Sequence, residues 1–226
     1  MKNKKKYYLY TMNMTILNTI SIVLFIVSVL LVALIMKLTN YNLSVNNKEF
    51  GIFYLLMIPY FIFHEVLHSI GYVVNGADFK KITYGVHLEK GVLCCLVKDN
   101  VSKKNILWSL IYPFMFIGVI TLIIGFLIHN AGLIFLSVMN ISGCSGDLLM
   151  FKAFRKLKDF EYSEYDDPTS FALYGDKSLE NLHMYGLKYV GVSDKLDRTI
   201  TKKIDVSKTS IVMIIIFLFI GLLNFI

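Results

Sequence analysis

Charged residues are scarce in this chain, and their scarcity is the first indication of where it resides. Asp, Glu, Lys and Arg make up 17% of its 226 residues, against about 25% in ordinary globular proteins. Hydrophobic residues make up 56%. The composition argues against an ordinary water-soluble domain and indicates that a lipid bilayer is the main solvent of the chain.

Three further features are missing. The chain has only three cysteines, and we expect Cys94, Cys95 and Cys144 at or near the cytoplasmic side, where thiols stay reduced, so no disulfide framework is implied. The first apolar run, 14–36, is too long for a signal peptide and lacks a small-x-small cleavage site. No internal repeat or low-complexity linker divides the chain. We therefore expect a single membrane domain over residues 1–226, with the first run retained as a span.

Long apolar runs define the predicted architecture. About 20 helical residues cross the roughly 30 Å hydrocarbon core of a bilayer, and a lipid-facing backbone must satisfy its own hydrogen bonds, which favours helices. The predicted spans are 14–36, 51–74, 105–128, 132–150 and 210–226. The expected fold is an all-α polytopic membrane protein of about five transmembrane helices, with a short cytoplasmic β-hairpin after the second helix.

The positive charge is distributed very unevenly. With the N-terminus inside, the inner segments hold 21 of the 23 Lys and Arg residues, and the outer segments hold only Lys37 and Lys48. Because such residues are retained on the cytoplasmic side, we expect a cytoplasmic N-terminus and an outside C-terminus in a multi-pass protein of the cell membrane. Topology and the lipid bilayer account for the net charge of +7, so a nucleic-acid partner is not needed.

Two cytoplasmic insertions separate the predicted spans. The first, 75–104, contains two short β-prone runs around a glycine-containing turn, which predicts a hairpin over about 82–97. The second, 151–208, is mixed polar and aromatic with a turn signal at Asp166-Asp167-Pro168, and its pattern predicts no particular fold.

The second predicted span carries His64-Glu65-Val66-Leu67-His68, a match to H-E-x-x-H. On a helix the two histidines share one face and can both bind zinc, and the glutamate can act as general base on the attacking water. Snorkelling polar residues near a helix end are the structural alternative. Ionisable groups inside a span cost about 2.5 to 3.5 kcal/mol each, so three of them within five positions require a partner.

A catalytic zinc usually has three protein ligands, and Asp147 of the fourth predicted span is the candidate for the third. Counting about 1.5 Å per residue from the outer ends of the two spans places His64 and His68 about 20 and 26 Å deep and Asp147 about 23 Å deep. Ser142 and Gly146, four residues apart, favour close helix approach in a membrane. His87, the Cys94-Cys95 pair and Cys144 remain competing ligands at this point.

Asn140 lies two turns before Asp147 on the same helical face. A buried amide there can bind the main chain of a substrate or stabilise an oxyanion, or it can make an interhelical hydrogen bond. Both interpretations stay open, and we include Asn140 as a candidate substrate-binding residue.

Together these motifs resemble the site-2 protease superfamily of intramembrane zinc metalloproteases, and in particular the small bacterial branch named putative zincin peptidases. The similarity covers roughly residues 51–150. It implies His64 and His68 as metal ligands, Glu65 as catalytic base and Asp147 as third ligand. The better-known branch has Asn-x-x-Pro followed by Asp-Gly, whereas this chain has Gly143 at the proline position and the order Gly146-Asp147.

The predicted function is that of a zinc-dependent endopeptidase cleaving a membrane-associated protein or peptide near the cytoplasmic half of the bilayer. One rival is a catalytically inactive, zinc-bearing membrane module that recruits or regulates a partner protein. Another is a transporter or channel component, which predicts ionisable residues spread across the bilayer rather than gathered at one depth.

Overall fold

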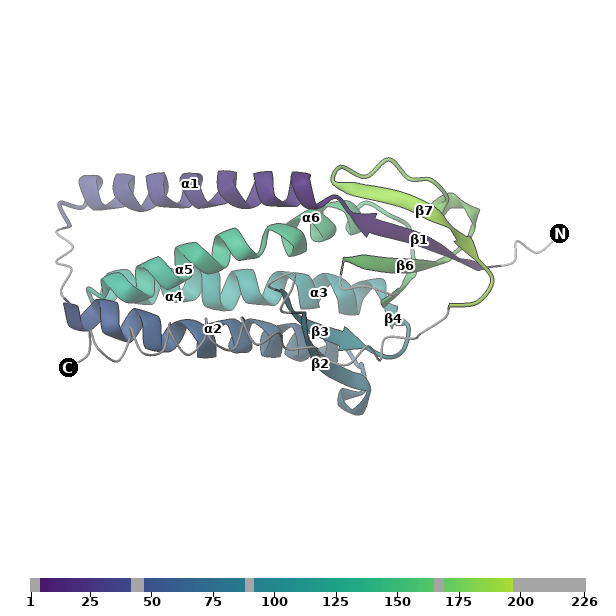
Figure 1. Ribbon diagram of the computed structural model, residues 1–226, viewed down its shortest axis with the longest axis horizontal. Coiled ribbons are helices and arrows are strands. Elements are labelled where there is room, and N and C mark those ends of the chain that lie inside the picture. Colours follow the sequence, from purple (N-terminus) through teal and green to yellow (C-terminus); the bar gives the residue numbers. More distant parts are fainter. Residues whose placement is uncertain (1–4, 42–46, 88–91, 165–168, 197–226) are drawn as a thin grey trace. The chain divides into compact units, whose positions relative to one another are not determined.

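The computed structural model describes residues 5–41, 47–87, 92–164 and 169–196 (Figure 1). Its helices are α1 (Met14–Leu38), α2 (Asn47–Val74), η1 (Phe79–Lys81), α3 (Lys103–Pro113), η3 (Phe114–Ile120), α4 (Thr121–Leu127), α5 (Ala131–Gly143), α6 (Ser145–Phe154) and η4 (Lys177–Leu179). Its strands are β1 (Lys6–Met12), β2 (Ile82–His87), β3 (Val92–Val97), β4 (Val101–Ser102), β5 (Glu161–Glu164), β6 (Ser170–Gly175) and β7 (Leu187–Ser193).

The chain forms two compact units. One contains the strands, the last part of α2, α3 and α6, and the other contains most of α1, the first part of α2, η3, α4 and α5. Helix α2 belongs to both and runs without interruption from Asn47 to Val74.

Three helical segments are long and apolar enough to cross a membrane, namely Met14–Leu38, Phe53–Val74 and Lys103–Leu127. The pair α5 and α6, bent by 47° at its break, would be a fourth if it counts as one span. The predicted span 210–226 lies outside the described residues. These segments mark the chain as a membrane protein.

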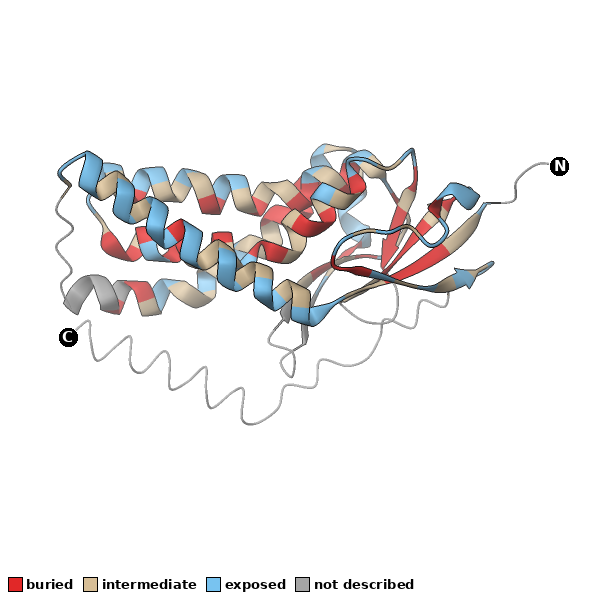
Figure 2. Ribbon diagram, turned by 90° about the horizontal axis from the view of Figure 1, so that it is seen from above, coloured by how far each residue is buried: buried red, intermediate tan, exposed pale blue. Residues whose placement is uncertain are grey.

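Helix α1 is exposed along most of its length (Figure 2). Ile22 and Leu30 expose 61% and 62% of their surface, and only Ser28 is buried. In water so large an apolar surface would be unfavourable, so these side chains are suited to contact lipid. One polar contact ties α1 to α5, where Ser21 and Ser142 lie 2.9 Å apart through their hydroxyl oxygens.

The all-α prediction is wrong, because the structure contains a five-stranded sheet in the order β4-β5-β6-β1-β7. All of its neighbouring strands are antiparallel. Strand β1, from the basic N-terminal segment, lies between β6 and β7, which come more than 150 residues later in the chain. Such pairing leaves no hairpin signal in the sequence, since hairpins are recognised by two neighbouring runs joined by a turn.

Aromatic side chains fill the core beneath this sheet. Tyr10 of β1 is fully buried and donates a hydrogen bond of 2.6 Å to the carbonyl of Leu179. Phe154, the last residue of α6, packs its ring against Phe160 and Phe171. The sheet thereby anchors the C-terminal end of α6, whose first turn carries Asp147.

The expected hairpin is present. β2 and β3 pair antiparallel from Ile82 opposite Val97 to His87 opposite Val92; residues 88–91 lie outside the described part of the chain. The Tyr84 hydroxyl donates to Ser69 of α2 at 2.7 Å, and the Val97 amide donates to Glu164 of β5 at 3.1 Å. The hairpin is therefore fastened both to α2 and to the five-stranded sheet.

Two of the predicted helices are irregular. The segment predicted as one helix over 105–128 begins as α3, passes through the π-helix η3 and ends as α4. The segment predicted over 132–150 is the pair α5 and α6, with the break at Cys144. Both irregularities lie next to residues of the candidate site.

Candidate metal centre

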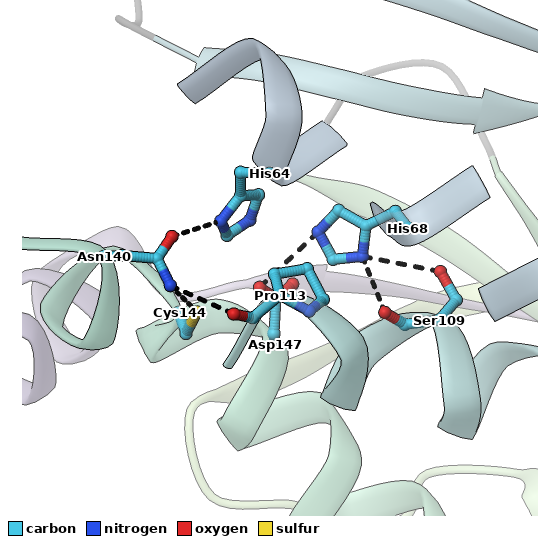
Figure 3. Close-up of polar contacts among 7 residues, drawn as sticks. All are labelled: His64, His68, Ser109, Pro113, Asn140, Cys144 and Asp147. Carbon is cyan, nitrogen blue, oxygen red and sulfur yellow. Dashed lines mark hydrogen bonds and ion pairs between the residues drawn. The ribbon is translucent and has the colours of Figure 1, made fainter. Parts of the chain in front are cut away.

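The two histidines of the H-E-x-x-H motif lie one turn apart on α2, and both are held by their Nδ1 atoms (Figure 3). His64 Nδ1 is 2.8 Å from Oδ1 of Asn140 on α5. His68 Nδ1 is 2.9 Å from the main-chain carbonyl of Ser109 on α3. Each ring is thus oriented by an oxygen from a different helix.

These contacts indicate the tautomer of both rings. A carbonyl oxygen only accepts hydrogen bonds, so each Nδ1 acts as the donor, and in the neutral ring this is the tautomer whose Nε2 can bind a metal. The Asn140 amide orientation agrees, since its Nδ2 donates to the Pro113 carbonyl at 3.2 Å and reaches Cys144 Sγ at 3.5 Å. Metal-binding histidines in proteins are commonly held in this way.

Asp147 provides a carboxylate close to the same place. Its Oδ2 is 3.6 Å from Nε2 of His68, and the two side chains expose only 17% and 11% of their surface. Asp147 stands in the first turn of α6, where the positive end of the helix dipole favours a negative charge. The break before α6 therefore gives the carboxylate a favourable electrostatic position.

The three residues fit a zinc ion. One ligand atom from each of His64, His68 and Asp147 lies within 4.8 Å of the others. Zinc bonds of about 2.1 Å in a tetrahedron place ligand atoms about 3.4 Å apart, close to the 3.6 Å between His68 and Asp147. Two imidazoles and one carboxylate match the three protein ligands of a catalytic zinc. Within the described residues, this is the one group of such side chains that could hold a metal ion.

The competing ligands lie outside this group. Cys144 is fully buried and contacts Asn140. Cys95 is buried, and its burial, with a smaller contribution from the Glu164 carboxylate, raises the pKa of its thiol well above the usual value. Cys95 is not part of the metal-ligand group. The side chain of His87 lies outside the described residues.

Glu65 follows His64 on α2 and is half-buried. The Glu65 carboxylate affects Glu164 of β5. Burial is the main cause that raises the pKa of Glu164 well above its ordinary value, and the negative charge of Glu65 adds to the shift. The metal-ligand group does not include Glu65. Its role as general base stays a prediction.

Several residues that shape the site carry no recognisable motif. Ser109 acts through its main-chain carbonyl, which no side-chain pattern reveals. Gly71 allows α3 to approach α2 there, since a Cβ on Gly71 would lie 2.5 Å from Cα of Ser109. The interhelical hydrogen bond considered for Asn140 is present, made to His64, while its substrate contact stays a prediction. Ser142 bonds to Ser21 of α1, and a Cβ on Gly146 would lie 3.5 Å from Leu17 of α1, so this pair of small residues faces α1.

Residues 57–160 match a family described as putative zincin peptidase. The match covers a little under half of the chain and includes His64, Glu65, His68 and Asp147. It supports a zinc peptidase-like family, without naming the site-2 protease superfamily, and it implies zinc as the metal for the ligand group. No curated protein and no solved structure matches the chain.

Proposed function

We propose that this protein is a zinc-dependent endopeptidase that cleaves a membrane-associated protein near the cytoplasmic half of the bilayer. The observation that carries the proposal is the convergence of His64, His68 and Asp147 on one point. Both histidines belong to the candidate span Phe53–Val74. The zincin description of residues 57–160 supports the peptidase chemistry.

Each group at the site has a separate role in the proposed reaction. Zinc, when bound, lowers the pKa of a water toward 7 and polarises the scissile carbonyl. Glu65 accepts the proton of the attacking water and delivers it to the leaving amine nitrogen as the C–N bond breaks. Asn140 and the Ser109 carbonyl keep the two imidazoles in the orientation that presents Nε2.

The membrane location rests on hydropathy and charge. The site lies toward the C-terminal end of α2, which precedes the basic insertion 75–104. Because basic loops stay in the cytoplasm, we propose a multi-pass protein with a cytoplasmic N-terminus, an outside C-terminus and the catalytic residues toward the inner leaflet. The resemblance to site-2 proteases agrees with intramembrane cleavage.

The hairpin is a suitable element for holding an extended substrate. Tyr84 of β2 is bonded to Ser69, the residue after His68, so β2 runs beside the ligand-bearing helix. A helical peptide bond is covered by its neighbours and must be unwound before hydrolysis. Strand addition along β2 would present the unwound segment to the site.

The test separates metal binding from cleavage. In the full chain purified in detergent, Glu65→Gln should retain close to one zinc per protein while cleavage falls by about 10²- to 10⁴-fold, the usual contribution of a general base. His68→Ala should lose both zinc and cleavage. Substrates are sought by comparing membrane proteins of cells that express the wild type or Glu65→Gln, looking for fragments that only the wild type produces.

The outcomes distinguish the rival functions. Stoichiometric zinc without any fragment dependent on Glu65 would favour the inactive zinc-bearing module. Absence of zinc from the wild type under metal-replete conditions would overturn the enzyme proposal.

A further inference from the structure

The π-helix η3 changes which main-chain carbonyls accept hydrogen bonds from the side chains of α2 and α5. At its end the Thr121 amide bonds to the carbonyl of Gly118. In a regular α-helix that amide would bond to Ile117. The Ile117 carbonyl therefore does not receive the Thr121 amide, and a side-chain donor can take the place of that amide.

Side chains supply that donor. The Tyr60 hydroxyl of α2 and the Thr121 hydroxyl both reach the Ile117 carbonyl, and their two oxygens lie 2.6 Å apart. The Thr121 oxygen is 2.7 Å from that of Ser137 on α5, and Ser137 donates to the Leu133 carbonyl at 2.8 Å. One assignment satisfies all three hydroxyls: Ser137 to Leu133, Thr121 to Ser137, and Tyr60 to Ile117.

A second main-chain carbonyl, just before η3, also accepts a side-chain hydrogen bond. Pro113, which precedes the π-helix, accepts a hydrogen bond from Asn140 Nδ2. Gly118 makes room for it, since a Cβ there would lie 3.1 Å from Ile141 and 3.5 Å from the Asn140 amide nitrogen. The π-helix segment is therefore bonded to α5 through Asn140 just before its first residue, and to α2 through Tyr60 at its middle.

Both bonds lead to the same metal ligand. Asn140 uses its other amide atom to accept from His64 Nδ1. Tyr60 stands one turn before His64 on the same face of α2, because residues four apart lie above one another on a helix. From this geometry we infer that η3 positions His64, with Tyr60 and Asn140 as the two positioning residues that connect it to the metal site.

This inference rests on the proposed zinc function only for the identity of the metal. Neither residue touches the metal, and their effect should appear in zinc affinity rather than in proton transfer. Second-layer partners of a ligand usually contribute about 10- to 100-fold to metal affinity. Asn140, which contacts His64, should fall in that range, and Tyr60, which is connected to His64 only through η3 and Asn140, should contribute about 3- to 10-fold.

The experiment measures zinc affinity of the purified full chain by competition with a chelator. Asn140→Ala should weaken binding about 10- to 100-fold, and Tyr60→Phe about 3- to 10-fold. Tyr54→Phe, six residues earlier on α2, is the matched control for a lost tyrosine hydroxyl.

A coupled measurement separates positioning from loss of fold. If both residues act through η3, the double variant of Tyr60→Phe and Asn140→Ala should bind zinc more tightly than the product of the single effects predicts. Cobalt(II) in place of zinc should show an altered visible spectrum in Tyr60→Phe, which reports changed ligand geometry rather than unfolding.

The inference is overturned if Tyr60→Phe binds zinc like the wild type or no worse than Tyr54→Phe, or if the two single effects simply multiply. A wild type that binds zinc but cleaves nothing would defeat the peptidase proposal and leave the positioning result intact. A wild type that binds no zinc would overturn both.

Discussion

Gly71 and Ser109 bring two helices into main-chain contact beside the metal site, so close that a Cβ on Gly71 would lie 2.5 Å from Cα of Ser109. The same stretch of α3 supplies the carbonyl that orients His68. Glycine at position 71 therefore lets α3 come close enough for the Ser109 carbonyl to accept a hydrogen bond from Nδ1 of His68.

Gly71→Ala should push α3 away and weaken zinc binding by loosening His68. We expect the overpacking to lower the free energy of unfolding by about 1 to 3 kcal/mol. Gly143→Ala is the control, because nothing lies within 4 Å of a Cβ at that position. Chelator competition and thermal unfolding in detergent measure the two effects. Equal behaviour of the two variants would show that the close contact does not control the site.

Asp147→Ala should abolish stoichiometric zinc binding, because it removes the only anionic member of the ligand group. Cys144→Ala removes the nearest competing ligand on the same bent helix pair and should retain zinc. Metal content per purified protein decides between them. Zinc retained in Asp147→Ala but lost in Cys144→Ala would assign the third ligand to the cysteine.

The ligand residues were accessible from the sequence because each carries its own chemical signal. His64 and His68 have helical spacing, and Asp147 is an ionisable residue in an apolar run at a matching depth. The depth argument assumed one straight helix, whereas Asp147 stands after a break, in the first turn of α6. Asp147 lies only three residues beyond the break, so the break changes its expected depth little.

The sheet could not be found in the same way. Tyr7, Tyr8 and Tyr10 of β1 have partners around residues 171–174 and 189–193, and local patterns contain no information about pairing at that distance. Basic residues just before β1 pointed instead to a cytoplasmic tail. Likewise, the Asn140 and Ser109 contacts depend on main-chain positions that only the folded helices define.

The 21 to 2 distribution of Lys and Arg predicts where reporter fusions will be active. Fusions after Asn100 and Glu180 should report the cytoplasm, and a fusion at Ile226 should report the outside, because basic segments are retained inside. An enzymatic reporter active on only one side of the membrane gives the answer at each position. A cytoplasmic result at Ile226 would remove one of the five predicted spans.

Glu164 should make the stability of the protein depend on pH. Burial, with a smaller contribution from Glu65, raises its pKa in the folded state, although the hydrogen bond from the Val97 amide opposes the shift. Well below the ordinary pKa of a glutamate, the carboxyl is protonated in both the folded and the unfolded state. Its titration then does not change the free energy of unfolding. As pH rises toward the folded-state pKa, only the unfolded state releases the proton, so folding loses up to about 1.4 kcal/mol per pH unit.

Glu164→Gln keeps an acceptor for the Val97 amide and removes the titration. The difference in stability between this variant and the wild type should be smallest at and below about pH 4.5, and it should grow steadily up to the folded-state pKa of Glu164. The measurement is the apparent melting temperature of metal-free protein in detergent across this range. Glu164→Leu should also lose this titration, but it should be less stable than Glu164→Gln at every pH, since it leaves the Val97 amide buried without an acceptor at a cost of about 1 to 3 kcal/mol. A wild type and Glu164→Gln whose difference stays constant with pH would mean that Glu164 is ionised in the folded protein, and its buried position beside Val97 would then require a cation that balances it.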